Sequence, residues 1–244
     1  MLLALASCAA CSAPRGHHPA VTDAPAAVAG PEQDHARADA RAPSTAIIRL
    51  GAIEVDRGAA AIRVPGSVAL REGWLEQAIC RVGSREHESL VSVEMPPSAV
   101  HAAMLLAGLK PGAPGRWRVR DDGSLELVPP TGERVDVEVE WTAADGRPMR
   151  CALTEWITTP KGAPPIVFVF SGSVTREAAA VPYAADQSGS VVGLVTFGDE
   201  PIASVAVVPD RAEVAEPSLL ARSERIPAEG TPVTIMIRRA APAR

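Results

Sequence analysis

Residues 80–112 read CRVGSREHESLVSVEMPPSAVHAAMLLAGLKPG and contain the one clear change from a β-type pattern to a helical pattern in the chain. Gly83-Ser84 separates two β-type runs, 75–82 and 85–93. A glycine followed by a small polar residue is typical of the two-residue loop of a type II′ hairpin. The stretch therefore predicts an antiparallel hairpin that turns at these two residues.

The register of this hairpin would place Cys80 opposite His87. Their Cβ atoms would lie about 4.5–5.5 Å apart, which is close enough for a thiol–imidazole contact. Arg85 would share their face, and strand alternation would direct Glu86 and Glu88 to the other face. Because a nearby imidazole and guanidinium favour a thiolate, Cys80, His87 and Arg85 are the candidate catalytic residues. The alternative is a small buried cysteine that packs against a hydrogen-bonded histidine.

A helix is predicted after the hairpin, over about residues 98–109. Pro96-Pro97 ends the strand pairing, Ser98 is a candidate N-cap, and Lys110 precedes a Pro-Gly pair that ends the helix. Apolar side chains cover the helix nearly all round, so we expect it to be buried.

The candidate ligand-binding residues are Glu86, Glu88, His101 and Lys110. The helix should return along the preceding strand and bring Lys110 beside residues 86–89. His101 is near the centre of the most apolar side of the helix, where the alternative is a core histidine that is hydrogen-bonded to a polar neighbour.

The remaining sequence is mostly of the β type. Residues 134–141 alternate valines with acidic residues, which predicts a half-buried strand with an acidic, solvated outer face. Other strands are expected at 46–56, 60–65, 116–120, 124–128, 151–157, 166–170, 190–197, 202–208 and 231–238. We therefore predict an α+β fold for a single domain at 46–239, predominantly antiparallel β with one buried helix.

The N-terminal segment resembles a bacterial lipoprotein signal. Residues 1–8 form a short apolar run that ends in Leu5-Ala6-Ser7-Cys8, so we expect Cys8 to carry a lipid. No Lys or Arg precedes this run, which a start codon placed too late would explain. Residues 9–45 are rich in Ala and Pro and lack bulky hydrophobic residues, which is typical of a disordered tether. These features predict a cell-envelope protein that is lipid-anchored and faces the periplasm or the exterior.

The net charge and the number of cysteines limit which partners and cofactors we expect. The net charge is −5 and no Lys/Arg cluster is present, so nucleic acid is not an expected partner. Only Cys80 and Cys151 lie in the expected domain, whereas an iron–sulfur cluster normally requires four thiolates. No cofactor is predicted. An exported protein permits a disulfide between these two cysteines, which is an alternative to the contact between Cys80 and His87.

The domain resembles the YdjY domain of bacterial exported proteins, from about residue 48 to residue 238. The residues that carry the resemblance are Cys80 with Arg85-Glu86-His87-Glu88-Ser89-Leu90, residues 102–112 and 168–173, Tyr183 with Asp186, and Ile226-Pro227 with Gly230-Thr231-Pro232-Val233. The resemblance implies an exported protein and brings no mechanism with it.

Two functions are compatible with these features. The first is a membrane-tethered envelope lipoprotein domain that binds a ligand or an envelope protein and performs no catalysis. The second is a thiol or metal site at Cys80 and His87, as in a Cys-His enzyme or a redox protein.

Overall fold

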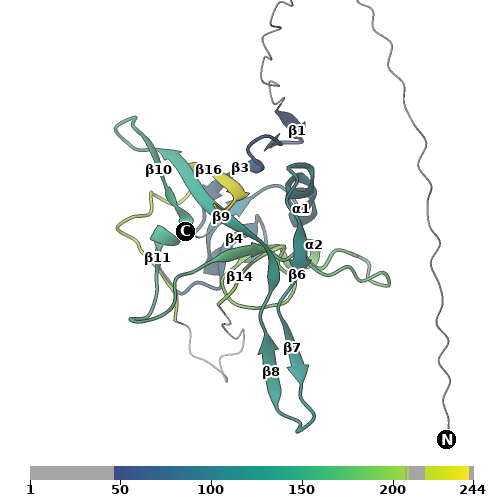
Figure 1. Cartoon of the computed structure of the whole chain (residues 1–244). Helices are drawn as coiled ribbons and strands as arrows, with labels where there is room; N and C mark the ends of the chain where they lie inside the picture. Colours follow the sequence, from purple (N-terminus) through teal and green to yellow (C-terminus); the bar gives the residue numbers. More distant parts are fainter. Residues whose placement is uncertain (1–46, 207, 209–217, 242–244) are drawn as a thin grey trace, which may run out of the picture. The chain divides into compact units, whose positions relative to one another are not determined.

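The computed structural model of the chain describes residues 47–206, 208 and 218–241 (Figure 1). The chain divides into two units, residues 1–42 and 43–244, and the described residues all lie in the second unit. The predicted signal segment, its Cys8 and the predicted tether lie outside the described residues. Within the part of the chain that is described, no helix is long and apolar enough to span a membrane.

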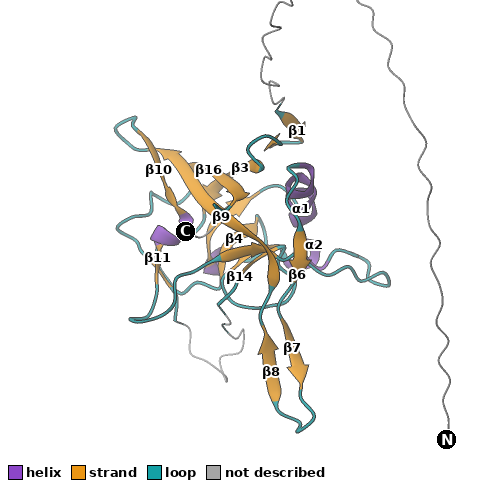
Figure 2. Cartoon of the chain, in the orientation of Figure 1, coloured by secondary structure: helices purple, strands orange, loops and turns teal. Residues whose placement is uncertain are grey.

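Eight strands close into a mixed β-barrel. The order around the wall is β3 (Ala61–Val68), β16 (Pro232–Arg239), β9 (Thr131–Thr142), β12 (Phe168–Phe170), β14 (Ile202–Ser204), β13 (Ser190–Gly193), β4 (Gln77–Arg81) and β5 (Ser89–Val93), which returns to β3. Neighbouring strands are antiparallel except β13–β14 and β4–β5, which are parallel. Strands dominate the described residues (Figure 2). A largely β domain was predicted and is confirmed, but the helical content is too small for a clear α+β fold.

Shorter elements extend this wall or pack on it. They are β1 (Ile48–Leu50), β2 (Ile53–Asp56), β6 (Pro111–Ala113), β10 (Pro148–Ala152), the hairpin of β7 (Arg116–Val119) and β8 (Leu125–Val128), the pair of β11 (Ile157–Thr158) and β15 (Leu220–Ala221), the helices α1 (Pro97–Leu106) and α2 (Ala184–Ser188), and the 3₁₀ turns η1 (Glu86–Glu88) and η2 (Leu153–Trp156). Both β6 and β10 pair with β9, while β2 pairs with β3.

The wall has two halves that differ in burial. In β5, β12, β13 and β14 every residue is buried, and in β4 only the last residue is exposed, so these five strands form what we call the covered half. In β3, β9 and β16 buried residues alternate with more exposed ones, and these strands form the open half. Both parallel pairs lie in the covered half, in agreement with the rule that parallel strands are covered on both faces.

Arginines neutralise the acidic outer face of β9. Glu138 forms ion pairs with Arg150 of β10 and Arg238 of β16, and Glu140 forms one with Arg63 of β3. The predicted half-buried strand with an acidic outer face is therefore correct, but its carboxylates bind arginines of β3, β10 and β16 and not only water.

The hairpin predicted at Gly83-Ser84 is wrong. The chain does turn there, with Gly83 at a φ of 78°, but β4 and β5 are parallel, with Gln77 opposite Ser89. Residues 82–88 run back along the two strands and include η1. Parallel strands are usually joined by a dozen or more residues, and this connection is much shorter. Because it is so short, the sequence pattern resembles that of a hairpin.

The predicted helix is present as α1, but it is only half buried. Leu105 and Leu106 are 48% and 43% exposed, whereas Val100 and Met104 face the core. Ser98 is not the N-cap, because the helix begins at Pro97.

Candidate functional site

Cys80 is a buried and protonated thiol. It lies in β4 between Ser190 of β13 and Ser92 of β5, and none of its surface is exposed. Burial raises the pKa of the thiol, and the hydrogen bond with the Ser89 side chain offsets this effect only in part. Because the thiolate is the reactive form, this environment opposes nucleophilic chemistry.

The predicted cluster of Cys80, His87 and Arg85 is wrong, because η1 turns the histidine outward. The His87 side chain is 78% exposed and its Nε2 lies 3.7 Å from Glu88 Oε2. The Arg85 guanidinium lies 4.1 Å from the centre of the Phe197 ring and forms an ion pair with Glu88 at 3.1 Å. The side chains of Arg85 and Glu88 are therefore engaged with each other and with Phe197, and of these two residues only Arg85, through its backbone, forms a hydrogen bond with the thiol.

The other predicted ligand-binding residues do not meet at one place. Glu86 Oε1 accepts the backbone N–H of Gly83, and this hydrogen bond lowers the pKa of Glu86. The backbone N–H of Lys110 donates to Glu133 Oε2 of β9 at 2.7 Å, so Lys110 lies at the start of β9. The expected polar cluster of Glu86, Glu88 and Lys110 is not formed.

The structure leaves Cys80 and Cys151 as free thiols, so the alternative of a disulfide between them is not realised. Cys151 lies in β10, and burial raises the pKa of its thiol to about 11. Cys8 and Cys11 lie outside the described residues. In the described ranges, no group of three or more His, Cys, Asp or Glu side chains is placed to hold a metal ion.

His101 joins the two helices. Its Nδ1 lies 2.6 Å from the Tyr183 hydroxyl, and its ring packs edge-on against Phe170 with centroids 4.9 Å apart. Asp186 of α2 accepts the backbone N–H of Ser98 in the first turn of α1 at 2.8 Å. Burial lowers the pKa of His101 and raises that of Tyr183, so both side chains are neutral near pH 7. This arrangement positions the helices on the wall.

A buried carboxyl group, which the sequence did not single out, lies in the covered half. Glu200 is fully buried; its Oε2 accepts the backbone N–H groups of Gly198 and Asp199, both at 2.9 Å, while its Oε1 has no hydrogen-bond partner. Burial raises the pKa of Glu200 to about 7. Gly193 makes room for this side chain, because a Cβ at that position would lie 2.9 Å from Glu200 Cγ.

A cavity opens where the covered half meets the open half, at the point where β12 and β10 end along the same edge of β9. The last pairing with β12 is at Val135 and the first pairing with β10 is at Glu138, so neither strand pairs with the two residues between them. We call this gap the fork. The cavity at the fork has a volume of about 430 Å³, within the range of small-ligand sites.

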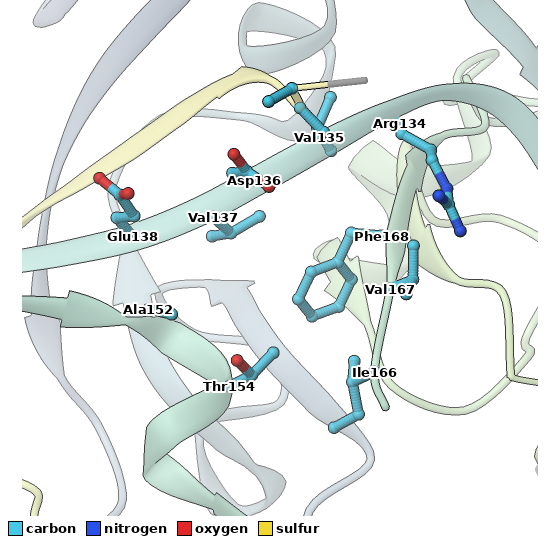
Figure 3. Close-up of a pocket in the computed structure, with 12 residues that line it drawn as sticks. Arg134, Val135, Asp136, Val137, Glu138, Ala152, Thr154, Ile166, Val167 and Phe168 are labelled. Carbon is cyan, nitrogen blue, oxygen red and sulfur yellow. The ribbon is translucent and has the colours of Figure 1, made fainter. Parts of the chain in front are cut away.

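The cavity has an apolar floor and a charged rim. Figure 3 shows Val137, Phe168, Ile166 and Thr154 around one space, with Arg134 beside Val167 at one end. Its lining residues are Arg134, Val135, Asp136, Val137, Glu138, Ala152, Thr154, Ile166, Val167, Phe168, Ala240 and Ala241. Sequence reasoning identified the strand 134–141 but not the fork, because a gap depends on where the neighbouring strands end.

Comparison with protein-family models gives a match to the YdjY domain over residues 53–238. The match covers more than half of the chain and includes the barrel wall from β3 to Arg238 in β16. It confirms the resemblance noted in the sequence. No curated protein and no solved structure matches the chain.

Proposed function

This chain belongs to the YdjY-domain family, and on that premise we propose that it is the binding domain of a lipoprotein held at the bacterial cell envelope. A lipid on Cys8 anchors the chain, residues 9–45 act as a tether, and the barrel binds a ligand or an envelope protein without catalysing a reaction. The observation that carries the binding role is the fork, where an apolar cavity adjoins a strand edge that has no ladder partner.

The lining of the fork is suited to binding a ligand. Ligand pockets generally combine an apolar lining with a few polar groups that fix orientation. The fork supplies the apolar part through Val137, Phe168 and Ile166, and the polar part through backbone groups and Arg134. The alternative function, a thiol or metal site at Cys80 and His87, has less support because the thiol is buried and protonated and the imidazole faces solvent.

The binding role is tested with the full-length chain, labelled with ¹⁵N, and a library of N-acetylated tripeptides. We expect amide chemical-shift changes concentrated at the fork, at Val137, Ala152, Thr154 and Phe168. Changes that concentrate elsewhere, or a library without any ligand, would contradict the proposal.

The anchor is tested separately by growing cells that express the chain with radiolabelled fatty acid. We expect label in the full-length chain and none in Cys8→Ala, with Cys11→Ala as the matched control that keeps its label. Equal labelling of the parent chain and Cys8→Ala would contradict the predicted attachment site.

A further inference from the structure

We propose that the fork captures the C-terminal end of a partner polypeptide whose last residue is apolar. The terminal side chain fills the cavity, the backbone pairs with Val137, and the terminal carboxylate binds Arg134. This inference rests on the proposed binding function and specifies the ligand. Four features of the fork support it.

The first feature is the direction of the backbone groups of β9. The carbonyl of Arg134 accepts the backbone N–H of Ala240 at 2.9 Å, on the side of β9 that faces β16. Backbone groups of successive residues point to alternate edges of a strand, so those of Val137 point to the opposite edge. Val137 lies between the last pairing with β12 and the first pairing with β10. Its backbone groups therefore face the fork and can bind an added strand.

The second feature is the length of the gap. Only residues 136 and 137 lack a ladder partner on this edge, because β12 occupies the edge on one side and β10 on the other. A strand that continued in both directions along β9 would overlap one of these two. A chain end that enters the gap and stops avoids this overlap, so the fork fits a terminus and not an internal segment.

The third feature is the cavity itself. The side chain of a residue paired with Val137 would lie on the same face as that of Val137, which is 4% exposed and belongs to the core. Phe168 and Ile166 line the space on that face (Figure 3). An apolar terminal side chain is therefore the group that the cavity accepts.

The fourth feature is the charge at the rim. Three charged residues line the cavity, Arg134, Asp136 and Glu138. Arg238 lies 3.5 Å from Asp136 and 2.9 Å from Glu138, so both carboxylates are already paired. Arg134 is exposed and forms no ion pair with any of the residues that the structure describes. A carboxylate is the complementary ligand for this guanidinium.

A second gap in the barrel lacks the first of these features. Along β3, pairing with β2 ends at Arg63 and pairing with β5 begins at Ser67. The residue that faces this gap is Pro65, which has no backbone N–H to donate. A Cβ on Gly66 would lie 2.7 Å from the carbonyl oxygen of Ser92, so the chain is closely packed there. The fork on β9 therefore has a backbone donor that faces the gap, which the gap on β3 lacks.

The experiment titrates the full-length chain with acetyl-Ala-Ala-Leu as the free acid and, separately, as the C-terminal amide. We expect the free acid to bind at the fork about tenfold or more tightly than the amide, because a charge-assisted contact with Arg134 is lost in the amide. Arg134→Gln should reduce the affinity for the acid to that for the amide. Arg57→Gln removes another exposed arginine, away from the cavity, and should leave the acid's preference unchanged.

The outcomes separate this inference from the proposed function. Equal affinities of acid and amide, with shifts at the fork, would overturn capture of a chain end and would leave the binding role intact. Shifts that avoid Val137 for both peptides would also overturn the inference, and the tripeptide library would then decide the binding role. Binding of the acid that is unaffected by Arg134→Gln would exclude Arg134 as the carboxylate's partner and overturn the inference as well.

Discussion

The covered and open halves of the barrel use polar groups in opposite ways. In the covered half, Cys80 and Glu200 are buried, burial raises the pKa of both groups, and their partners are backbone and hydroxyl groups. In the open half, Glu138 and Glu140 lie on the outer face and form ion pairs with arginines of β3, β10 and β16. Cys80 and Glu200 are thus inaccessible to solvent, whereas the cavity lies beside the ion-paired face.

The difference shows that a residue type is a poor guide to a site when its surroundings are unknown. Cys80 and His87 are close in the sequence and suggested a thiol or metal site. In the structure, Cys80 is buried in the core and the His87 side chain faces solvent. Val137 carries no reactive group, but it lies between the ends of β12 and β10, so its backbone groups face an opening in the wall.

The largest expected effect concerns the buried carboxyl group of the covered half. The folded chain raises the pKa of Glu200 to about 7 from its ordinary value of 4.5, so the folded state holds the proton more tightly than the unfolded state. The contribution of Glu200 to stability is therefore greatest below pH 4.5 and is lost as the pH rises through about 7. At about 1.4 kcal/mol per pH unit this difference corresponds to about 3 kcal/mol.

Glu200→Gln cannot ionise and should therefore raise the free energy of unfolding at pH 8 by up to about 3 kcal/mol, measured by urea denaturation. The variant should also be less dependent on pH between 5 and 8. Glu94→Gln, which changes an exposed carboxylate, is the matched control and should follow the parent. A variant as pH-dependent as the parent would show that Glu200 is not the group that titrates.

The second prediction compares a thiol from each half. With Cys8 and Cys11 replaced by Ser, a native chain at pH 8 should label with a thiol reagent at Cys151 at least about tenfold faster than at Cys80, since only Cys151 is partly exposed. Both should label slowly compared with a small-molecule thiol, because burial raises both pKa values.

Mass spectrometry of the labelled peptides gives the two rates. Denaturing the chain first should make the rates equal, which is the control for intrinsic reactivity. Fast labelling of Cys80 in the native chain would contradict its burial in the covered half and would again support a thiol site at Cys80.

The smallest effect is expected for the ion pairs of the open half. Glu138→Gln removes the charge that pairs with Arg150 and Arg238, whose side chains are 47% and 43% exposed. We expect a loss of at most about 1 kcal/mol in the free energy of unfolding, which should shrink further in 1 M salt because exposed pairs are screened. Glu72→Gln is the control on an exposed loop. A loss that persists in high salt would mean that Glu138 contributes through packing.

Strands were predicted correctly in both halves of the barrel, but the pairing of β4 and β5 in the covered half was not, for a physical reason. A strand with one buried face carries the alternation that identified residues 134–141 as a half-buried strand, in agreement with β9. A strand with two buried faces carries no alternation, so residues 75–93 could not reveal that β4 and β5 are parallel. The turn at Gly83 was recognised correctly, but its local signal does not specify which strands pair.

The candidate site was less predictable than the fold. Its cavity arises because β12 has three residues and β10 has five, so both end before they meet along the longer β9. No local pattern encodes where two distant strands end relative to a third. The helix was predicted nearly in register, yet its contact between His101 and Tyr183 joins residues 82 positions apart.

The position of β16 also constrains how the chain can be made. It is the last strand of the wall, and it pairs with β3 along one edge and with β9 along the other. When the ribosome has released the chain up to residue 231, seven of the eight wall strands are present. The missing strand is β16, which joins β3 to β9. Folding during synthesis must wait for the final segment, and until then the nascent chain exposes two long strand edges that a holding chaperone would have to shield.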